Sequence, residues 1–172
     1  MVELTPAELT LLGLLVEKPR HGYELEEVIT ERGMREWTEI GFSSIYYLLT
    51  KLRDRGLIAE TAEPAHGKAR KVFAPTPAGF QSCAAAAEEA VAVLRPVFPP
   101  VLAGLANQPV IPPARLRAAL ARRAQALTDK IAEVRAAAER QEPPPFVRAI
   151  FDFSLGQLEA EQRWLTTYRG EL

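Results

Sequence analysis

The sequence has few of the residues that build catalytic centres and metal sites. It contains two isolated histidines and one cysteine, Cys83. No recognisable carboxylate pair and no glycine-rich phosphate loop accompanies them, so we expect no enzyme, no metal site and no cofactor. A single cysteine also excludes an internal disulfide framework and fits a reducing cytoplasm. In its alanine-rich surroundings, Cys83 is interpreted as a small buried thiol rather than a redox sensor.

Long apolar runs and excess charge are missing as well. No stretch approaches about 18 uninterrupted apolar residues, so no transmembrane helix is expected, and no basic segment precedes the first apolar run as in a secretory signal. The formal net charge of -1 provides no overall attraction to nucleic acid. The charge is nevertheless polarised, because residues 43 to 80 carry six Lys or Arg against three acids, whereas the 42 residues before them are acidic.

Residues 42 to 57 predict the helix around which the chain is organised. Its apolar residues lie three or four apart and form one buried stripe: Ile45, Leu48, Leu49 and Leu52. Ser43 or Ser44 supplies the N-cap, and Gly56 supplies the positive-φ position that ends the helix. The opposite face is polar and carries Ser43, Tyr47, Thr50, Lys51 and Asp54. Packing does not explain this second face, which therefore predicts contact with a partner.

A hairpin with a basic tip is predicted directly after this helix. The runs 57 to 60 and 72 to 74 favour strands, and Pro64 and Gly67 form the turn between them. The basic residues of the hairpin are Lys68, Arg70 and Lys71. A helix followed by a basic two-stranded ribbon is the order of a winged helix-turn-helix, in which the helix enters a major groove and the wing contacts the flanking backbone.

Two further helices are predicted upstream. Thr5-Pro6-Ala7-Glu8 is a capping box with proline at the first helical position, and Pro19 ends the helix that it starts. His21-Gly22 opens the second helix, which stops at Gly33. Residues 5 to 75 therefore contain all the elements of a tri-helical winged domain.

The remaining chain predicts long helices separated by prolines. An alanine-rich helix is expected over 78 to 94, and the six prolines between 95 and 113 leave room only for a short helical turn over 101 to 105. Apolar residues spaced alternately four and three apart predict a helix with a coiled-coil seam over 114 to 141. A run of three prolines then reverses the chain, and a last helix follows over 146 to 168.

The last helix carries two apolar stripes, which one helix hairpin cannot cover. One stripe contains Phe151, Leu155, Leu158 and Leu165, and the other contains Phe146, Ile150, Phe153 and Trp164. We interpret the excess as an interface with a second copy of the chain, and a single-chain helical bundle is the alternative. The residues expected in the dimer interface are Leu127, Ile131, Val134, Ile150, Phe151, Phe153, Leu158, Trp164 and Leu165.

The sequence thus predicts a mainly α protein with two regions. Residues 1–80 form a winged helix-turn-helix DNA-binding domain with three helices and a two-stranded wing, and residues 81–172 form an all-α dimerisation and effector region. The residues expected to reach base edges are Ser43, Ser44, Tyr47, Thr50 and Lys51. Those expected to contact phosphates are Tyr23, Lys68, Arg70 and Lys71. The alternative function is a winged-helix module that binds a protein instead of DNA.

Several motifs together resemble the PadR-like transcriptional regulators. They are Leu11-Leu12-Gly13-Leu14-Leu15 ahead of Pro19, His21-Gly22-Tyr23-Glu24-Leu25, Ser44-Ile45-Tyr46, Gly56-Leu57-Ile58, and Thr76-Pro77-Ala78-Gly79. The match spans about the first 80 residues. The tail, with Phe151-Asp152-Phe153 and Leu158-Glu159-Ala160-Glu161, is similar to the long two-helix C-terminal region of one branch of that family.

The resemblance implies a cytoplasmic homodimeric repressor that binds a palindromic operator in double-stranded DNA. In several members a small-molecule effector releases the DNA. By the family's pattern, Tyr23, Ser44 and Tyr46 lie at the DNA face and the basic wing contacts the backbone. Tyr47 stands where many members carry proline, so the family's pattern does not define which residues of the third helix reach bases.

Overall fold

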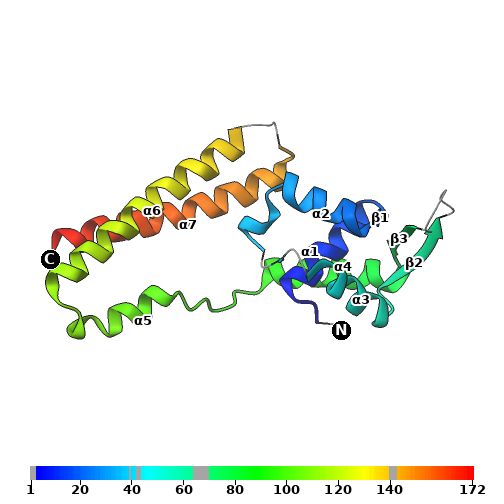
Figure 1. Cartoon of the computed structure of the whole chain (residues 1–172), viewed down its shortest axis with the longest axis horizontal. Coiled ribbons are helices and arrows are strands. Elements are labelled where there is room, and N and C mark those ends of the chain that lie inside the picture. The colour runs from blue at the N-terminus through cyan, green and yellow to red at the C-terminus, as the bar shows by residue number, and fades with distance from the viewer. Residues whose placement is uncertain (1–2, 39, 42–43, 64–69, 140–142) are drawn as a thin grey trace. The chain divides into compact units, whose positions relative to one another are not determined.

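The computed structural model describes residues 3–38, 40–41, 44–63, 70–139 and 143–172. Within these ranges the chain is mainly helical and has one small antiparallel sheet (Figure 1). It divides into two compact units, Met1–Pro96 and Val97–Leu172. The fold class predicted from the sequence is confirmed.

The first unit begins with two helices whose ends follow local sequence signals. Helix α1, Pro6–Glu17, has the predicted capping box: the hydroxyl of Thr5 accepts a hydrogen bond from the Glu8 amide at 3.2 Å, and the Thr5 amide donates to Glu8 Oε2 at 2.8 Å. Helix α2, Gly22–Glu31, ends before Gly33, which has a φ of 60°. A short 3-10 turn, Met34–Glu36, follows it.

Helix α3, Ser44–Asp54, is the predicted central helix, and Gly56 with a φ of 69° closes it. Its apolar stripe is buried as predicted and joins side chains of α1, α2 and the sheet in one core. Burial of each of these aliphatic side chains contributes about 1.5–3 kcal/mol. The core contains Leu11, Leu12, Leu14, Leu15, Leu25, Ile29, Ile40, Ile45, Leu48, Leu49, Leu52, Leu57, Ile58 and Phe73.

The sheet has three strands in the order β1-β3-β2, all antiparallel. Strands β2, Ile58–Glu63, and β3, Arg70–Pro75, form the predicted wing. Strand β1, Arg20–His21, pairs with Phe73 and Val72 at the other edge of β3 and was not predicted. Two residues are too few to show the alternation by which a strand is recognised in a sequence.

Helix α4, Pro77–Ala92, completes the first unit. The hydroxyl of Thr76 caps it by accepting from the Gly79 amide at 3.0 Å. A Cβ atom at Gly79 would lie 1.8 Å from the carbonyl oxygen of Leu57, so the helix can begin at this place only with glycine. The half-buried Cys83 packs against the core, and burial raises the pKa of its thiol.

The second unit is a helical hairpin preceded by short helical turns. Helix α5, Pro100–Ala106, and a 3-10 turn, Gln108–Val110, lead to α6, Pro113–Glu139, and α7, Pro145–Gly170. Helices α6 and α7 lie side by side along their length (Figure 1). Their core contains Leu116, Leu120, Leu127 and Leu165.

Ion pairs between described residues cross the hairpin. Arg135 Nη2 lies 2.6 Å from Glu159 Oε1, and Arg123 pairs with Glu161. Among the helices in the described ranges, none combines the length and the apolar character that crossing a membrane requires.

Candidate nucleic-acid interface

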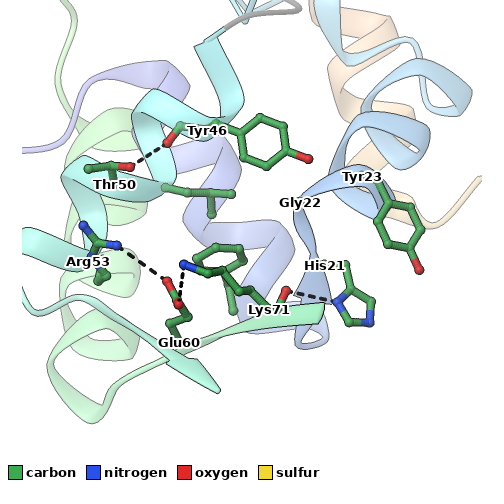
Figure 2. Close-up of a pocket in the computed structure, with 10 residues that line it drawn as sticks. His21, Gly22, Tyr23, Tyr46, Thr50, Arg53, Glu60 and Lys71 are labelled. Carbon is green, nitrogen blue, oxygen red and sulfur yellow. Dashed lines mark hydrogen bonds and ion pairs between the residues drawn. The ribbon is translucent and has the colours of Figure 1, made fainter. Parts of the chain in front are cut away.

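A cleft of about 580 Å³ lies on the first unit between the start of α2, helix α3 and the sheet (Figure 2). Helix α3 contributes a ring, a hydroxyl and a guanidinium, and the sheet contributes an acid and an amine. The lining residues are His21, Gly22, Tyr23, Tyr46, Leu49, Thr50, Arg53, Glu60, Lys71 and Phe73.

Gly22 of α2 and Tyr46 of α3 approach each other closely in this cleft. A Cβ atom at Gly22 would lie 2.7 Å from Cε1 of Tyr46, so the missing side chain leaves room for the ring. Tyr46 is nevertheless 62% exposed and the next residue, Tyr47, is 67% exposed. Both hydroxyls are therefore available to a partner at the surface of α3.

His21 ties the start of α2 to the wing. Its Nδ1 lies 3.0 Å from the carbonyl oxygen of Lys71, and because a carbonyl can only accept, the ring donates this hydrogen bond. The His21 ring also stacks on Tyr23 with ring centroids 5.3 Å apart. His21 is thus a structural hydrogen-bonding residue of the cleft wall.

One acid on β2 holds two cations of the cleft. Glu60 Oε1 accepts from Lys71 Nζ at 2.7 Å, and Glu60 Oε2 lies 3.5 Å from Arg53 Nη1. Figure 2 shows both interactions converging on Glu60. The hydrogen bond from Lys71 is the main cause that lowers the pKa of the Glu60 carboxyl, so the acid is charged at neutral pH.

Lys51 points away from the cleft. Its Nζ lies 2.9 Å from Oε1 of Glu8 on α1, and the same oxygen accepts from Arg55 Nη1 at 2.9 Å. Lys51 therefore has a structural partner, and a base contact would require it to leave Glu8.

Two of the predicted hydroxyls are also engaged locally. Thr50 Oγ1 donates to the carbonyl oxygen of Tyr46 at 3.0 Å, and Ser44 Oγ donates to that of Gly41 at 2.6 Å. Each oxygen still has accepting capacity toward a partner. Ser43 and Lys68 lie outside the described residues, and the Arg70 side chain is likewise not described.

The sequence analysis missed two charged residues of the cleft, Arg53 and Glu60. The signal for Arg53 was present, because Tyr46, Thr50 and Arg53 follow the spacing of one helix face. Glu60 carries no comparable signal, since its partners come from two other elements. Among the described residues, no group of three His, Cys, Asp or Glu side chains lies close enough together to hold a metal ion.

In the second unit, the residues predicted for a dimer interface divide into two sets. Leu127, Ile131 and Leu165 are buried within the chain's own fold. Phe153 is 68% exposed and Trp164 is 38% exposed, with the Trp164 ring stacked on Tyr168 at 5.5 Å. The half-buried members of the predicted set are Val134, Ile150, Phe151 and Leu158.

These features define a winged-helix fold followed by a helical C-terminal region. Residues 11–85 match the transcriptional regulator PadR-like family. This match confirms, over these residues, the resemblance to the PadR-like family that the motifs indicated. A comparison with curated protein sequences gave no match.

Solved structures share the fold over both units. Bacillus subtilis PadR in complex with operator DNA is 17% identical, with a TM-score of 0.73 over 95% of this chain and 97% of that chain. The same protein in complex with p-coumaric acid is 17% identical, with a TM-score of 0.76. The match covers 95% of this chain and 96% of that chain. The PadR-like transcriptional regulator BC1756 from Bacillus cereus is 16% identical, with a TM-score of 0.70. The match covers 98% of this chain and 97% of that chain.

Proposed function

We propose that this chain is a sequence-specific DNA-binding transcriptional regulator that acts in the cytoplasm as a homodimeric repressor. The observation that carries the proposal is the exposed face of α3, which presents Tyr46 and Tyr47 to solvent, with Tyr46 lining the same cleft as Lys71 of the wing. In winged-helix proteins such a helix enters the major groove and the wing contacts the flanking backbone. The likeness to a structure of PadR with operator DNA supports the same use here.

Within this proposal the residues of α3 and those of the wing have different tasks. Tyr46, Tyr47 and Thr50 would contact base edges, with Ser43 and Ser44 at the start of the helix. Tyr23 and the cations of the wing would contact phosphates, which fix the register without choosing the sequence. Lys51 would contact a base only if its amine left the carboxylate of Glu8. The proposed wing cations are Lys68, Arg70 and Lys71.

The dimer would be formed by the second unit. Phe153 on α7 is largely exposed and Trp164 is partly exposed in the single chain, and a second copy would bury them. A twofold dimer would place two α3 helices for half-sites one helical turn apart, about 34 Å, and therefore selects a palindromic operator. Repression would follow because the bound dimer blocks access of the polymerase to the promoter.

A small-molecule effector is also part of the proposal. The likeness to PadR in complex with p-coumaric acid supports it, since the fold of that structure covers the helical region of this chain as well. An effector that binds the DNA-free state more tightly than the DNA-bound state would weaken DNA binding by that difference in affinity. The division into a DNA-binding region 1–80 and a dimerisation and effector region 81–172 belongs to this proposal too.

Binding to DNA can be tested with two fluorescent duplexes, one from upstream of the protein's own gene and one of random sequence. We expect the purified protein to prefer the upstream duplex and to bind both less tightly as salt rises. Lys71→Ala should weaken binding to both duplexes by the same factor. It should also reduce the slope of log affinity against log salt by about one. Lys18→Ala removes the same charge from an exposed residue after α1 and serves as the matched control.

Two results would contradict the proposal. If the folded protein binds neither duplex even at low salt, the exposed face of α3 contacts a protein instead, which is the alternative function. If Lys71→Ala changes binding to one duplex only, Lys71 is not a backbone contact.

A further inference from the structure

The two cations that face the cleft from α3 and β3 are held by one acid in the DNA-free protein. Glu60 lies 2.7 Å from the amine of Lys71 and 3.5 Å from the guanidinium of Arg53. The Lys71 side chain is 61% exposed, and that of Arg53 is 42% exposed. Both cations can therefore be reached by an anion from solvent without any rearrangement of the core.

A carboxylate and a phosphate offer these cations the same kind of partner. Both are anionic oxygens that accept short, charge-assisted hydrogen bonds from ammonium and guanidinium groups. Glu60 already occupies this position between Arg53 and Lys71. A phosphate that binds the same two cations must either displace Glu60 or share the cations with it. Sharing is unfavourable because the two anions repel each other.

We propose that Glu60 is an internal competitor for a backbone phosphate of DNA, holding Arg53 and Lys71 in the free protein and releasing them when the phosphate binds. This inference rests on the DNA-binding function proposed above. Glu60 then lowers the affinity for every duplex by the same factor, because a phosphate carries no sequence information. Contacts from Tyr47 to base edges are unaffected by it.

The stability of the domain does not require this acid. Arg53 has a second acidic partner, since its Nη2 lies 2.9 Å from Asp54 Oδ1. Ion pairs between exposed side chains contribute little to the free energy of folding.

The test compares wild type with Glu60→Gln on the upstream and random duplexes over a salt series. We expect Glu60→Gln to bind both duplexes about fivefold more tightly, with the ratio between them unchanged. The slope of log affinity against log salt should become steeper by about one, because one more positive charge is available to phosphate. Glu89→Gln, an exposed residue of α4 that does not line the cleft, is the control for net charge.

A double-mutant cycle separates competition for the cations from a general effect of charge. In the background of Arg53→Ala with Lys71→Ala, Glu60→Gln should no longer tighten binding about fivefold, because no cation remains to be released. Thermal unfolding should show that all variants are folded. If Glu60→Gln is not, Glu60→Thr, which suits a strand, replaces it in the same comparison.

The outcomes distinguish this inference from the function on which it rests. If wild type binds DNA and Glu60→Gln binds it equally or more weakly, Glu60 does not compete with phosphate but orients the two cations, and the inference is wrong. If Glu60→Gln tightens binding equally in the double-alanine background, repulsion at long range explains the effect and the inference is also wrong. If wild type binds neither duplex, the proposed function fails and the inference fails with it.

Discussion

Arg55 Nη1 donates a hydrogen bond of 2.9 Å to Glu8 Oε1, and so connects the end of α3 to the first turn of α1. The Glu8 side chain is only 1% exposed, and its oxygens also accept from Lys51 and from the amide of Thr5. One carboxylate therefore caps α1 and fixes the helix that is proposed to enter the major groove. A buried acid with several donors is costly to remove because its partners remain.

Glu8→Gln should lower the free energy of unfolding by about 2 kcal/mol, because two cations lose their anionic partner. Urea denaturation at neutral pH measures this change. Glu27→Gln, at an exposed position of α2, should change stability by less than about 0.5 kcal/mol. Equal effects of the two substitutions would show that the Glu8 network does not stabilise the fold.

The same carboxyl predicts how stability depends on pH. Burial alone would raise the pKa of Glu8, but hydrogen bonds from Thr5 and Lys51 outweigh burial and hold the pKa below its ordinary value of 4.5. The stabilisation is therefore fully present above pH 4.5 and is lost as the pH falls through the lower value of the folded state. The difference in unfolding free energy between wild type and Glu8→Gln should shrink over that acidic range. A constant difference would contradict this account.

Replacing two of the glycines by alanine should change the stability of the protein in opposite directions. Gly79→Ala places a Cβ atom 1.8 Å from the backbone oxygen of Leu57, which cannot turn aside as a side chain can, so we expect a loss of about 2–3 kcal/mol. At Gly13, inside α1, no atom lies within 4 Å of the added Cβ, and alanine should stabilise by about 0.5–1 kcal/mol. Thermal unfolding of both variants measures the contrast. A tolerated Gly79→Ala would contradict the close start of α4.

Gly22→Ala should affect DNA binding more than stability. The added Cβ meets only the ring of Tyr46, a side chain that can rotate away, so the melting temperature should change little. If Tyr46 contacts DNA, moving the ring should weaken binding about fivefold, the equivalent of one hydrogen bond of about 1 kcal/mol. Adding Gly22→Ala to Tyr46→Ala should then have no further effect. Additive losses would mean that Gly22 acts through something other than the ring.

Phe153→Glu should convert the proposed dimer into a monomer with the chain mass of 19.0 kDa. Phe153 is largely exposed in the single chain, so the charge leaves the α6–α7 hairpin intact and acts only on a partner's surface. Size-exclusion chromatography with light scattering measures the mass, and Gln157→Glu on the same helix is the control. A dimer that survives Phe153→Glu would place the interface elsewhere.

Elements with local signals could be predicted from the sequence. The capping residues Thr5 and Thr76 begin helices, and Gly33 and Gly56 end them, because each acts on backbone groups within one turn. The apolar stripe of α3 follows from its own spacing. What could not be predicted depends on partners far away in the chain, such as the pairing of β1 with β3.

The candidate site shows the same limit. The outward position of Tyr47 follows from helix periodicity, whereas the direction of Lys51 depends on Glu8, which belongs to another helix. Periodicity defines the face of a residue but not which of several acids a flexible amine contacts.

The pairing of β1 with β3 affects how the protein folds while it is synthesised on the ribosome. His21 donates to the carbonyl of Lys71, 50 residues further along the chain. At about 5–20 residues per second, this stretch takes several seconds to synthesise, and until then α2 has no sheet against which to anchor its first turn. The cleft is therefore completed only after β3 has been made, and a nascent chain interrupted before β3 would carry the third helix without the wall that shapes its binding face.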